Sequence, residues 1–175
     1  MVQPIRVSQR FGHRNRSALE VSEAEFDRCF AVNVKSLYLA TQYAVPVFRS
    51  QGGGSFINIA STAGLRPRPG LTWYNGSKAA VIGTSKSMAA ELGPDNIRVN
   101  CINPVFNPDT GLSAEFAGGP VDDARRAKFL ATIPLGRFST ALDVANATGV
   151  EVVQLNSTSP GYMEAPLRRI EFKLR

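Results

Sequence analysis

The stretch that decides the fold runs from Ser61 to Lys78 and reads STAGLRPRPGLTWYNGSK. Before it lies Phe56 to Ala60, a short apolar run introduced by three glycines, which has the length and the turn signals of a buried strand. After it, apolar residues recur at helical spacing. We therefore expect Ser61 at the carboxyl end of a strand, with Tyr74 and Lys78 four residues apart on one helix face.

This predicted arrangement would bring three reactive groups to one place. Ligands of open α/β sheets bind outside the carboxyl ends of the strands, so the Ser61 hydroxyl, the Tyr74 phenol and the Lys78 ammonium would converge there. A phenol has an ordinary pKa of about 10, and a cation about 5 Å away would lower that pKa by roughly 2 units. Burial raises the pKa, so we expect the effect of Lys78 to outweigh burial.

Four blocks of sequence, in order, resemble those of a known family. The Tyr74 and Lys78 pair is weak evidence alone, but its position thirteen residues after Ser61 is much more specific. The blocks are Val32 to Val34, Asn58 to Gly64, Tyr74 to Lys78, and Ile97 to Pro104. From about Ala18 to about Val150 the chain resembles the short-chain dehydrogenase/reductase family. It is most similar to members named 3-oxoacyl-carrier-protein reductases or sugar dehydrogenases, and these motifs do not separate the two.

The resemblance implies hydride transfer between NAD or NADP and a carbonyl or alcohol substrate. It implies four catalytic residues: Tyr74 as the general acid or base, Lys78 to lower the phenol pKa and hold the nicotinamide ribose, Ser61 to stabilise the oxyanion, and Asn33 to support a proton relay. The cofactor contacts that it implies are Tyr74, Lys78, Pro104, Val105 and Thr110. The family has a Pro-Gly pair where this chain has Pro104 and Val105, so the contacts with the nicotinamide differ here. No metal is expected.

The expected fold class is α/β, as the carboxyl-terminal part of a Rossmann-like doubly wound parallel sheet. A dinucleotide fold needs a strand, a glycine-rich turn and a helix that meets the pyrophosphate, and none of the 15 glycines forms that pattern. We therefore expect that the first βαβ cofactor-binding half is absent and that the chain is truncated at its amino terminus. Residues 1–153 would form a partial NAD(P)-binding domain, and residues 154–175 a divergent tail. The alternative is a non-catalytic remnant that retains only dimerisation surfaces.

The remaining elements are predicted from caps and periodicity. Ser22 and Glu25 form a capping box that opens a long helix running to Phe48. No regular pattern is evident from Pro104 to Pro120, and Phe129 with Leu130 could cover a substrate mouth. The other predicted elements are a helix from Thr72 to Leu92, a strand from Ile97 to Asn103, a helix over Asp122 to Ala131, a short helix near Thr140 to Asp143, and a strand over Val150 to Val153.

The amino-acid composition limits the cellular compartment and the classes of binding partner that we expect. The 175 residues carry a net charge of +6, and without a recognised binding motif this basic surface favours an anionic cofactor over nucleic acid. The two cysteines, Cys29 and Cys101, indicate buried free thiols in a reducing, cytoplasmic compartment. No membrane span or signal peptide is expected. The expected partners are a small carbonyl or alcohol substrate and, in the intact family member, a second copy in a homo-oligomer.

Because this chain has no glycine-rich pyrophosphate turn, we predict that it binds NAD or NADP weakly or not at all. Titration calorimetry with the 175-residue chain measures this directly. A dissociation constant in the low micromolar range would show that the cofactor site has been misplaced.

Overall fold

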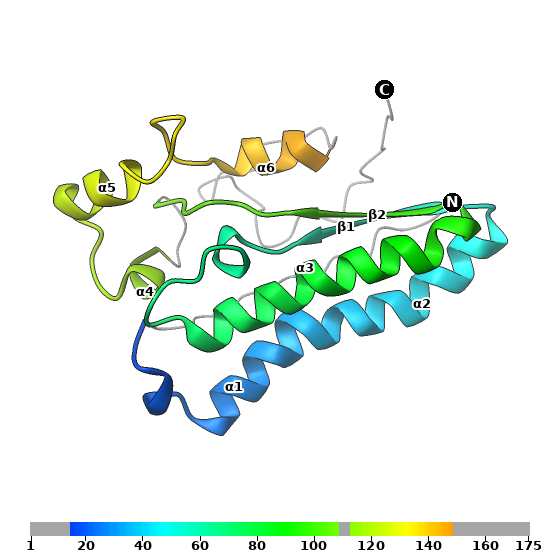
Figure 1. The fold of residues 1–175 in the computed structure, drawn as a ribbon, viewed down its shortest axis with the longest axis horizontal. Helices are drawn as coiled ribbons and strands as arrows, with labels where there is room; N and C mark the ends of the chain where they lie inside the picture. The colour runs from blue at the N-terminus through cyan, green and yellow to red at the C-terminus, as the bar shows by residue number, and fades with distance from the viewer. Residues whose placement is uncertain (1–14, 109–112, 149–175) are drawn as a thin grey trace, which may run out of the picture.

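The computed structural model describes residues 15–108 and 113–148, which form an α/β arrangement (Figure 1). In chain order the elements are the 3-10 turn η1 (Ala18–Glu20), α1 (Glu23–Phe30), the π-helical turn η2 (Ala31–Lys35), α2 (Ser36–Ser50), β1 (Gly54–Ile59), the 3-10 turn η3 (Thr62–Gly64), α3 (Thr72–Leu92), the 3-10 turn η4 (Gly93–Asp95), β2 (Ile97–Ile102), α4 (Ser113–Ala117), α5 (Asp123–Leu130) and α6 (Ala141–Thr148).

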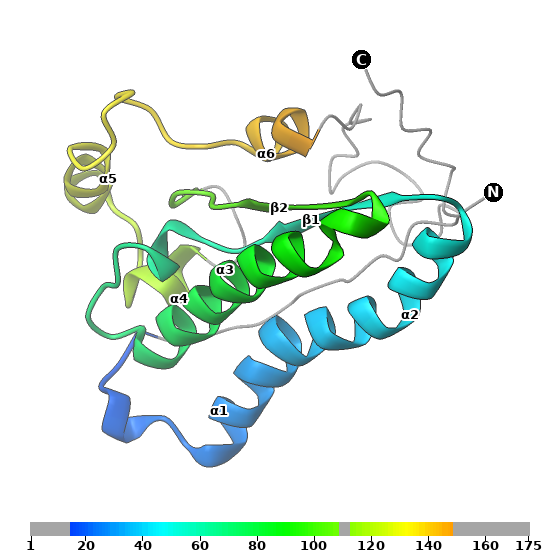
Figure 2. The same ribbon diagram turned by 45° about the vertical axis from the view of Figure 1, so that its right-hand side comes forward.

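Strands β1 and β2 pair in parallel and form the sheet of the described residues. The register aligns Gly54 with Ile97 and Ile59 with Ile102, so both strands end at the same edge. Helices α2 and α3 lie on one side of the sheet and α6 lies on the other, as the two ribbon views show (Figures 1 and 2). Parallel strands joined by a crossover helix are typical of doubly wound folds, which confirms the predicted fold class.

A capped and interrupted helical run leads into the sheet. The Ser22 hydroxyl accepts a hydrogen bond from the Glu25 N–H, and the Glu25 carboxylate accepts one from the Ser22 N–H, so the predicted capping box is present. Helix α1 then passes through the π-helical turn η2 into α2 without leaving the helical path. Such single π turns widen a helix locally and are frequent at functional sites. This one carries the buried Asn33.

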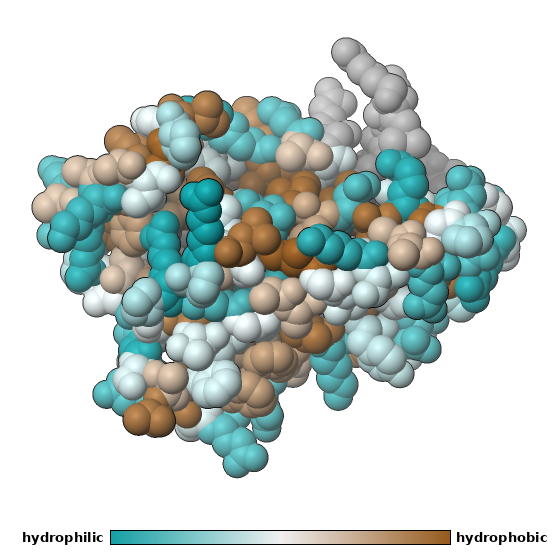
Figure 3. All heavy atoms as spheres, in the orientation of Figure 1, coloured by the Kyte–Doolittle hydropathy of each residue, from teal (hydrophilic) through white to brown (hydrophobic). Residues whose placement is uncertain are grey.

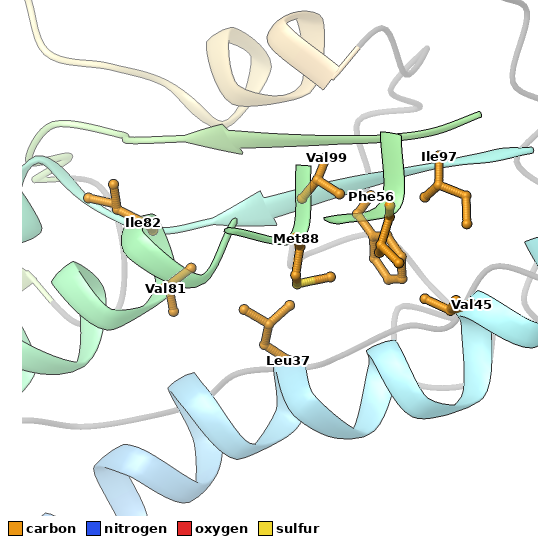
Figure 4. Close-up of a cluster of buried hydrophobic side chains, with 10 residues drawn as sticks. Leu37, Val45, Phe56, Val81, Ile82, Met88, Ile97 and Val99 are labelled. Atoms are coloured by element: carbon orange, nitrogen blue, oxygen red, sulfur yellow. The ribbon is translucent and has the colours of Figure 1, made fainter. Parts of the chain in front are cut away.

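The core lies between the sheet and helices α2 and α3 (Figure 4). Phe56 of β1 and Ile97 and Val99 of β2 point toward the helices, because alternate residues of a strand face the same side. Their partners from the helices are Leu37, Val45, Val81, Ile82, Met88 and Leu92. A polar contact adds to this packing, since the Asn58 side-chain amide donates to the Ser85 hydroxyl at 2.9 Å.

The outer face of β1 differs from the buried strand that the sequence predicts. Ile57 and Ile59 are 37% and 39% exposed, whereas Phe56 is 8% exposed. The reason is that α2 and α3 cover only the inner face, and α6 leaves part of the outer face open. Apolar side chains accordingly reach the surface between α3 and α6 (Figure 3).

Other predicted boundaries can be compared directly. The helix from Thr72 to Leu92 is confirmed, and Asp122 proves to be the cap of α5 rather than its first residue. A loop was expected throughout residues 104–120, yet α4 forms within it, where Phe116 packs against Tyr74. The predicted strand over residues 150–153 and the tail over residues 154–175 lie outside the described residues.

Within the described part of the chain, no helix has both the length and the apolar character needed to cross a bilayer.

The two sheet faces should respond differently to the same substitution. We predict that Ile97→Ala, at a side chain that is 1% exposed, lowers the free energy of unfolding by about 2–5 kcal/mol. Ile59→Ala on the exposed face is the matched control, with an expected loss of less than half as much. Urea unfolding of both variants gives the comparison, and equal losses would mean that the outer face is as well packed as the core.

Candidate active site

Ser61 lies just beyond the carboxyl end of β1. The Ala60 N–H continues the ladder by donating to the Ile102 carbonyl at 2.8 Å, after which the chain turns into η3. The Ser61 hydroxyl caps that turn by accepting a hydrogen bond from the Ala63 N–H at 3.1 Å. The predicted position of this hydroxyl at the carboxyl edge of the sheet is therefore confirmed.

A close approach between η3 and α3 fixes this turn against the helix. A Cβ added to Gly64 would lie 2.8 Å from the carbonyl carbon of Lys78 and from the backbone nitrogen of Ala79. Real side chains essentially never come so near to backbone atoms, so only glycine fits at this position without a shift of the helix. The turn that carries Ser61 thus rests directly on the part of α3 that carries Lys78.

Tyr74 and Lys78 lie together on α3, as their spacing predicts. The Lys78 ammonium nitrogen is 5.7 Å from the centroid of the Tyr74 ring, and the ammonium donates to the Ile59 carbonyl at 3.0 Å. The Tyr74 ring also meets the Phe116 ring edge to face, with centroids 4.8 Å apart. Lys78 is only 5% exposed, so its charge is held inside the protein beside the end of β1.

The electrostatics differ from the sequence-based expectation. Burial, the largest effect, raises the pKa of the Tyr74 phenol, and a hydrogen bond with the Ser61 hydroxyl opposes this only in part. Burial also lowers the pKa of the Lys78 ammonium. The expectation that Lys78 outweighs burial is therefore wrong, because burial favours the neutral phenol.

Asn33 reaches α3 through a small buried network. Its side-chain amide donates to the Ser77 hydroxyl at 2.9 Å and to the Cys29 sulfur at 3.7 Å. Ser77, which is fully buried, in turn donates to the Tyr74 carbonyl at 2.8 Å. These contacts tie η2 to the turn of α3 that presents Tyr74, and the proton-relay role of Asn33 stays a prediction.

The residues after β2 lie beside this site. The Pro104 carbonyl accepts hydrogen bonds from the Thr62 N–H at 3.1 Å and the Thr62 hydroxyl at 3.3 Å. The Val105 carbonyl accepts one from the Ser139 hydroxyl at 3.1 Å. The structure thus brings Pro104 and Val105 to the end of the sheet where Ser61 lies, whereas Thr110 lies outside the described residues.

A cavity of about 330 Å³ opens next to these residues. Its lining residues come from the segment after β1, the segment after β2 and the end of α5 with the turn that follows it: Thr62, Leu65, Arg66, Arg68, Val105, Phe106, Phe129, Thr132, Ile133 and Pro134. Phe129, predicted to cover a substrate mouth, lines it. Leu130, predicted with it, is not among the lining residues.

Sequence reasoning missed three residues that shape the site. Phe116 packs on Tyr74 from a segment without a regular pattern, so no local signal could have found it. Ser77 and Asn75 stand inside the Tyr74 to Lys78 block but were given no role. Asn75 is buried and its amide donates to the Arg68 carbonyl at 2.8 Å, which holds the Pro-rich loop on α3.

Within the described residues, no three His, Cys, Asp or Glu side chains gather as metal ligands would.

Comparisons with known proteins agree with this geometry. A family model described as enoyl-(acyl carrier protein) reductase matches residues 7–167. The chain is 50% identical over 135 residues to 4-formylbenzenesulfonate dehydrogenase of Comamonas testosteroni, covering 77% of this chain and 53% of that protein. It is 36% identical over 132 residues to the 3-oxoacyl-(acyl-carrier-protein) reductase of Thermotoga maritima, covering 75% of this chain and 51% of the relative.

Solved structures give the same result. The 3-ketoacyl-(acyl-carrier-protein) reductase of Brucella melitensis complexed with NADH has a TM-score of 0.69 and 38% identity, over 79% of this chain and 54% of that one. A putative NAD(P)-dependent gluconate 5-dehydrogenase of Beutenbergia cavernae with bound NADP has a TM-score of 0.71 and 26% identity, over 78% and 53%. The chain thus spans about half the length of the relatives it matches. Its sequence matches and its site geometry show that this chain belongs to the short-chain dehydrogenase/reductase family.

Proposed function

We propose that this chain carries the catalytic residues of an NAD(P)-dependent oxidoreductase that interconverts a carbonyl compound and an alcohol. The observation that carries the proposal is the convergence of Ser61, Tyr74 and Lys78 at the carboxyl end of β1. Ligands of parallel α/β sheets bind at that edge. The family membership supports the same reaction class.

Tyr74 is the proposed general acid in the reductive direction. The phenol is protonated at neutral pH, and burial, which raises its pKa, also makes it a weaker acid; it can deliver a proton to a carbonyl oxygen because that oxygen becomes a strongly basic alkoxide. The Ser61 hydroxyl, already hydrogen-bonded with the phenol, can donate to the same oxygen and stabilise its developing charge. In the oxidative direction the phenol must first lose its proton, which its raised pKa disfavours at neutral pH.

The residues present fit the ribose and nicotinamide side of NAD or NADP. An ammonium has three donors, and the hydrogen bond from Lys78 to the Ile59 carbonyl uses one, which leaves two for ribose hydroxyls. A buried acceptor, the side-chain oxygen of Asn103, has no partner and lies just before Pro104. Tyr74, Pro104 and Val105 are the other proposed contacts on this side of the cofactor, and Thr110, proposed with them, lies outside the described residues. When bound, the cofactor supplies the hydride.

The proposed substrates are small carbonyl or alcohol compounds. Support comes from the names of the relatives, which include a 4-formylbenzenesulfonate dehydrogenase and a 3-oxoacyl-(acyl-carrier-protein) reductase. The cavity of about 330 Å³ lined in part by Thr62 and Val105 is of a size that suits a small ligand. We further propose a cytoplasmic setting, because Cys29 and Cys101 are free thiols.

A second candidate is a non-catalytic role in self-association. The observation that favours it lies on α2, where Tyr38, Leu39, Tyr43 and Val47 are between 41% and 71% exposed. Exposed apolar side chains on one helix are typical of protein interfaces. Such a surface is also consistent with a homo-oligomeric enzyme, so activity decides between the two candidates.

Removal of the phenolic hydroxyl tests the catalytic assignment. In a chimera that joins the amino-terminal half of a full-length relative to this chain, Tyr74→Phe should lower carbonyl reduction at least 100-fold, since a general acid contributes about 10²-fold or more. Cofactor affinity should change less than about twofold. The matched control is Tyr43→Phe, at a phenol that is 71% exposed on α2. Retention of more than a tenth of the rate by Tyr74→Phe would refute the role.

The raised pKa of Tyr74 predicts that its phenol loses its proton at a higher pH than an ordinary tyrosine does. Because burial favours the neutral phenol, tyrosinate absorbance from this residue should appear only above the ordinary value of about 10. The carbonyl-reduction rate should then stay level through neutral pH and fall only in strong alkali. The difference between ultraviolet pH titrations of the native chain and Tyr74→Phe isolates this group. A midpoint below about 9 would show that Lys78 dominates after all.

A further inference from the structure

We propose that Asn15 is a positioning residue for Tyr74, because its side chain holds α4 and the loop before α3 together beside the Tyr74 ring. The inference rests on the proposed function, in which Tyr74 is the general acid. Asn15 belongs to residues 15–18, the strap, which begins beside α4 and the start of α3 and leads toward α1 (Figures 1 and 2).

The Asn15 side chain lies between two glycines from separate segments. Its amide donates to the Phe116 carbonyl in α4 at 3.2 Å. A Cβ added to Gly70 would overlap the Asn15 side-chain oxygen, and a Cβ added to Gly118 would lie 3.2 Å from the Asn15 Cβ. Both glycines have a positive φ, +81° and +77°, which larger residues rarely adopt. Asn15 therefore joins the loop before α3 to α4 and the turn after it.

Both of these segments adjoin the proposed acid. The Phe116 ring meets the Tyr74 ring edge to face, with centroids 4.8 Å apart, so the position of α4 decides how that ring is covered. Gly70 is separated by one residue from the start of α3, and Tyr74 is the third residue of that helix. A shift of either segment would therefore change the surroundings or the placement of the phenol.

The first turn of α3 depends on contacts from outside the helix. Its N-cap residue makes no side-chain hydrogen bond to the turn, and helix ends without such partners fray. The strap supplies two contacts instead. The Arg16 N–H donates to the Gly70 carbonyl at 3.0 Å, and the Ala18 carbonyl accepts a hydrogen bond from the Trp73 indole at 3.2 Å. These contacts hold the backbone on the amino-terminal side of Tyr74.

The strap is itself attached to α1. The Arg16 guanidinium forms an ion pair with Glu25, whose carboxylate also takes part in the cap of α1. The Trp73 ring meets the Phe26 ring of α1 edge to face, with centroids 5.2 Å apart. Asn15 thus extends from a segment that α1 and α3 hold in place, and it can hold α4 in turn.

The test measures the ionisation of Tyr74 in the 175-residue chain. The difference between ultraviolet pH titrations of a variant and of the same variant with Tyr74→Phe isolates this phenol, and circular dichroism at each pH shows whether the chain stays folded. Burial raises the pKa of the phenol, and the Phe116 ring is part of what buries it. Asn15→Ala should let water reach the phenol and lower its midpoint by about half a pH unit or more. Gly70→Ala, whose new Cβ would displace the Asn15 side chain, should shift the midpoint in the same direction.

A similar pair at the opposite edge of the sheet provides the matched controls. The Asn96 amide donates to the Gly52 carbonyl at 3.0 Å, just before β1 and β2 begin. Asn96→Gly removes that donor and suits the φ of +58° at this position. Gly52→Ala carries the same kind of backbone strain as Gly70→Ala, at a φ of +78°, but its Cβ meets no atom within 4 Å. Neither control should move the Tyr74 midpoint.

The pH profile of the reaction gives a second readout. In the chimera used for Tyr74→Phe, Asn15→Ala should move the alkaline fall of the carbonyl-reduction rate to lower pH by the same shift as the midpoint. A mere loss of folded protein would lower the rate at every pH without moving that fall. The titratable groups that act on the phenol, Lys78 and Cys29, are unchanged in these variants.

An unchanged Tyr74 midpoint in Asn15→Ala or in Gly70→Ala would overturn the inference. An equal shift in Asn96→Gly or Gly52→Ala would overturn it too, because the effect would then reflect a general loosening of the fold. An alkaline fall that stays in place when the midpoint moves would also count against it. If the midpoint shifts as expected but Tyr74→Phe keeps its activity, the proposed function fails, whereas the placement of the Tyr74 ring by Asn15 stands.

Discussion

The site depends on the close contact between the turn after β1 and helix α3. Gly64 permits backbone to approach backbone, and the hydrogen bond from the Lys78 ammonium to the Ile59 carbonyl joins the helix to the end of the strand. Both interactions hold the turn that carries Ser61 against the helix that carries Tyr74. A side chain at position 64 would clash with the backbone of Lys78 and Ala79, so the turn or the helix would have to shift. The core beneath, built on Phe56, Ile97 and Val99, keeps the strand ends in register with the helix.

The same contact determines the electrostatics. It places the Lys78 ammonium in a buried position, where loss of hydration lowers its pKa, and it places the partly buried Tyr74 phenol where burial raises the pKa. The two shifts act in the same sense, since each favours the neutral form of its group. Hydrogen bonds with the Ser61 hydroxyl and with the Ile59 carbonyl hold the two groups at the end of β1.

The proposed catalytic residues and the cavity walls come from different parts of the chain. Tyr74 and Lys78 lie on α3, and Ser61 lies just beyond the end of β1, so all three are attached to the packed layers of the fold. The cavity walls come instead from the Pro-rich loop, the segment after β2 and α5, where Arg68, Phe106 and Phe129 meet. Loops on a rigid scaffold can change without disturbing the core.

The sequence by itself determined the local elements and the spacing of the reactive groups. Helical periodicity places Tyr74 and Lys78 on one face, the Ser22 and Glu25 box starts the first helix, and the strand before Ser61 follows from its apolar run; these signals depend only on near neighbours. Three other contacts depend on the tertiary structure alone. They are the ring contact between Phe116 and Tyr74, the hydrogen bond from Asn33 to Ser77, and the cation–π contact of Arg68 with Phe129. The tertiary structure also decided the sign of the pKa shift at Tyr74 and the exposure of Ile57 and Ile59. The physical reason is that burial and contacts between distant segments depend on how the elements pack, which no local pattern in the sequence encodes.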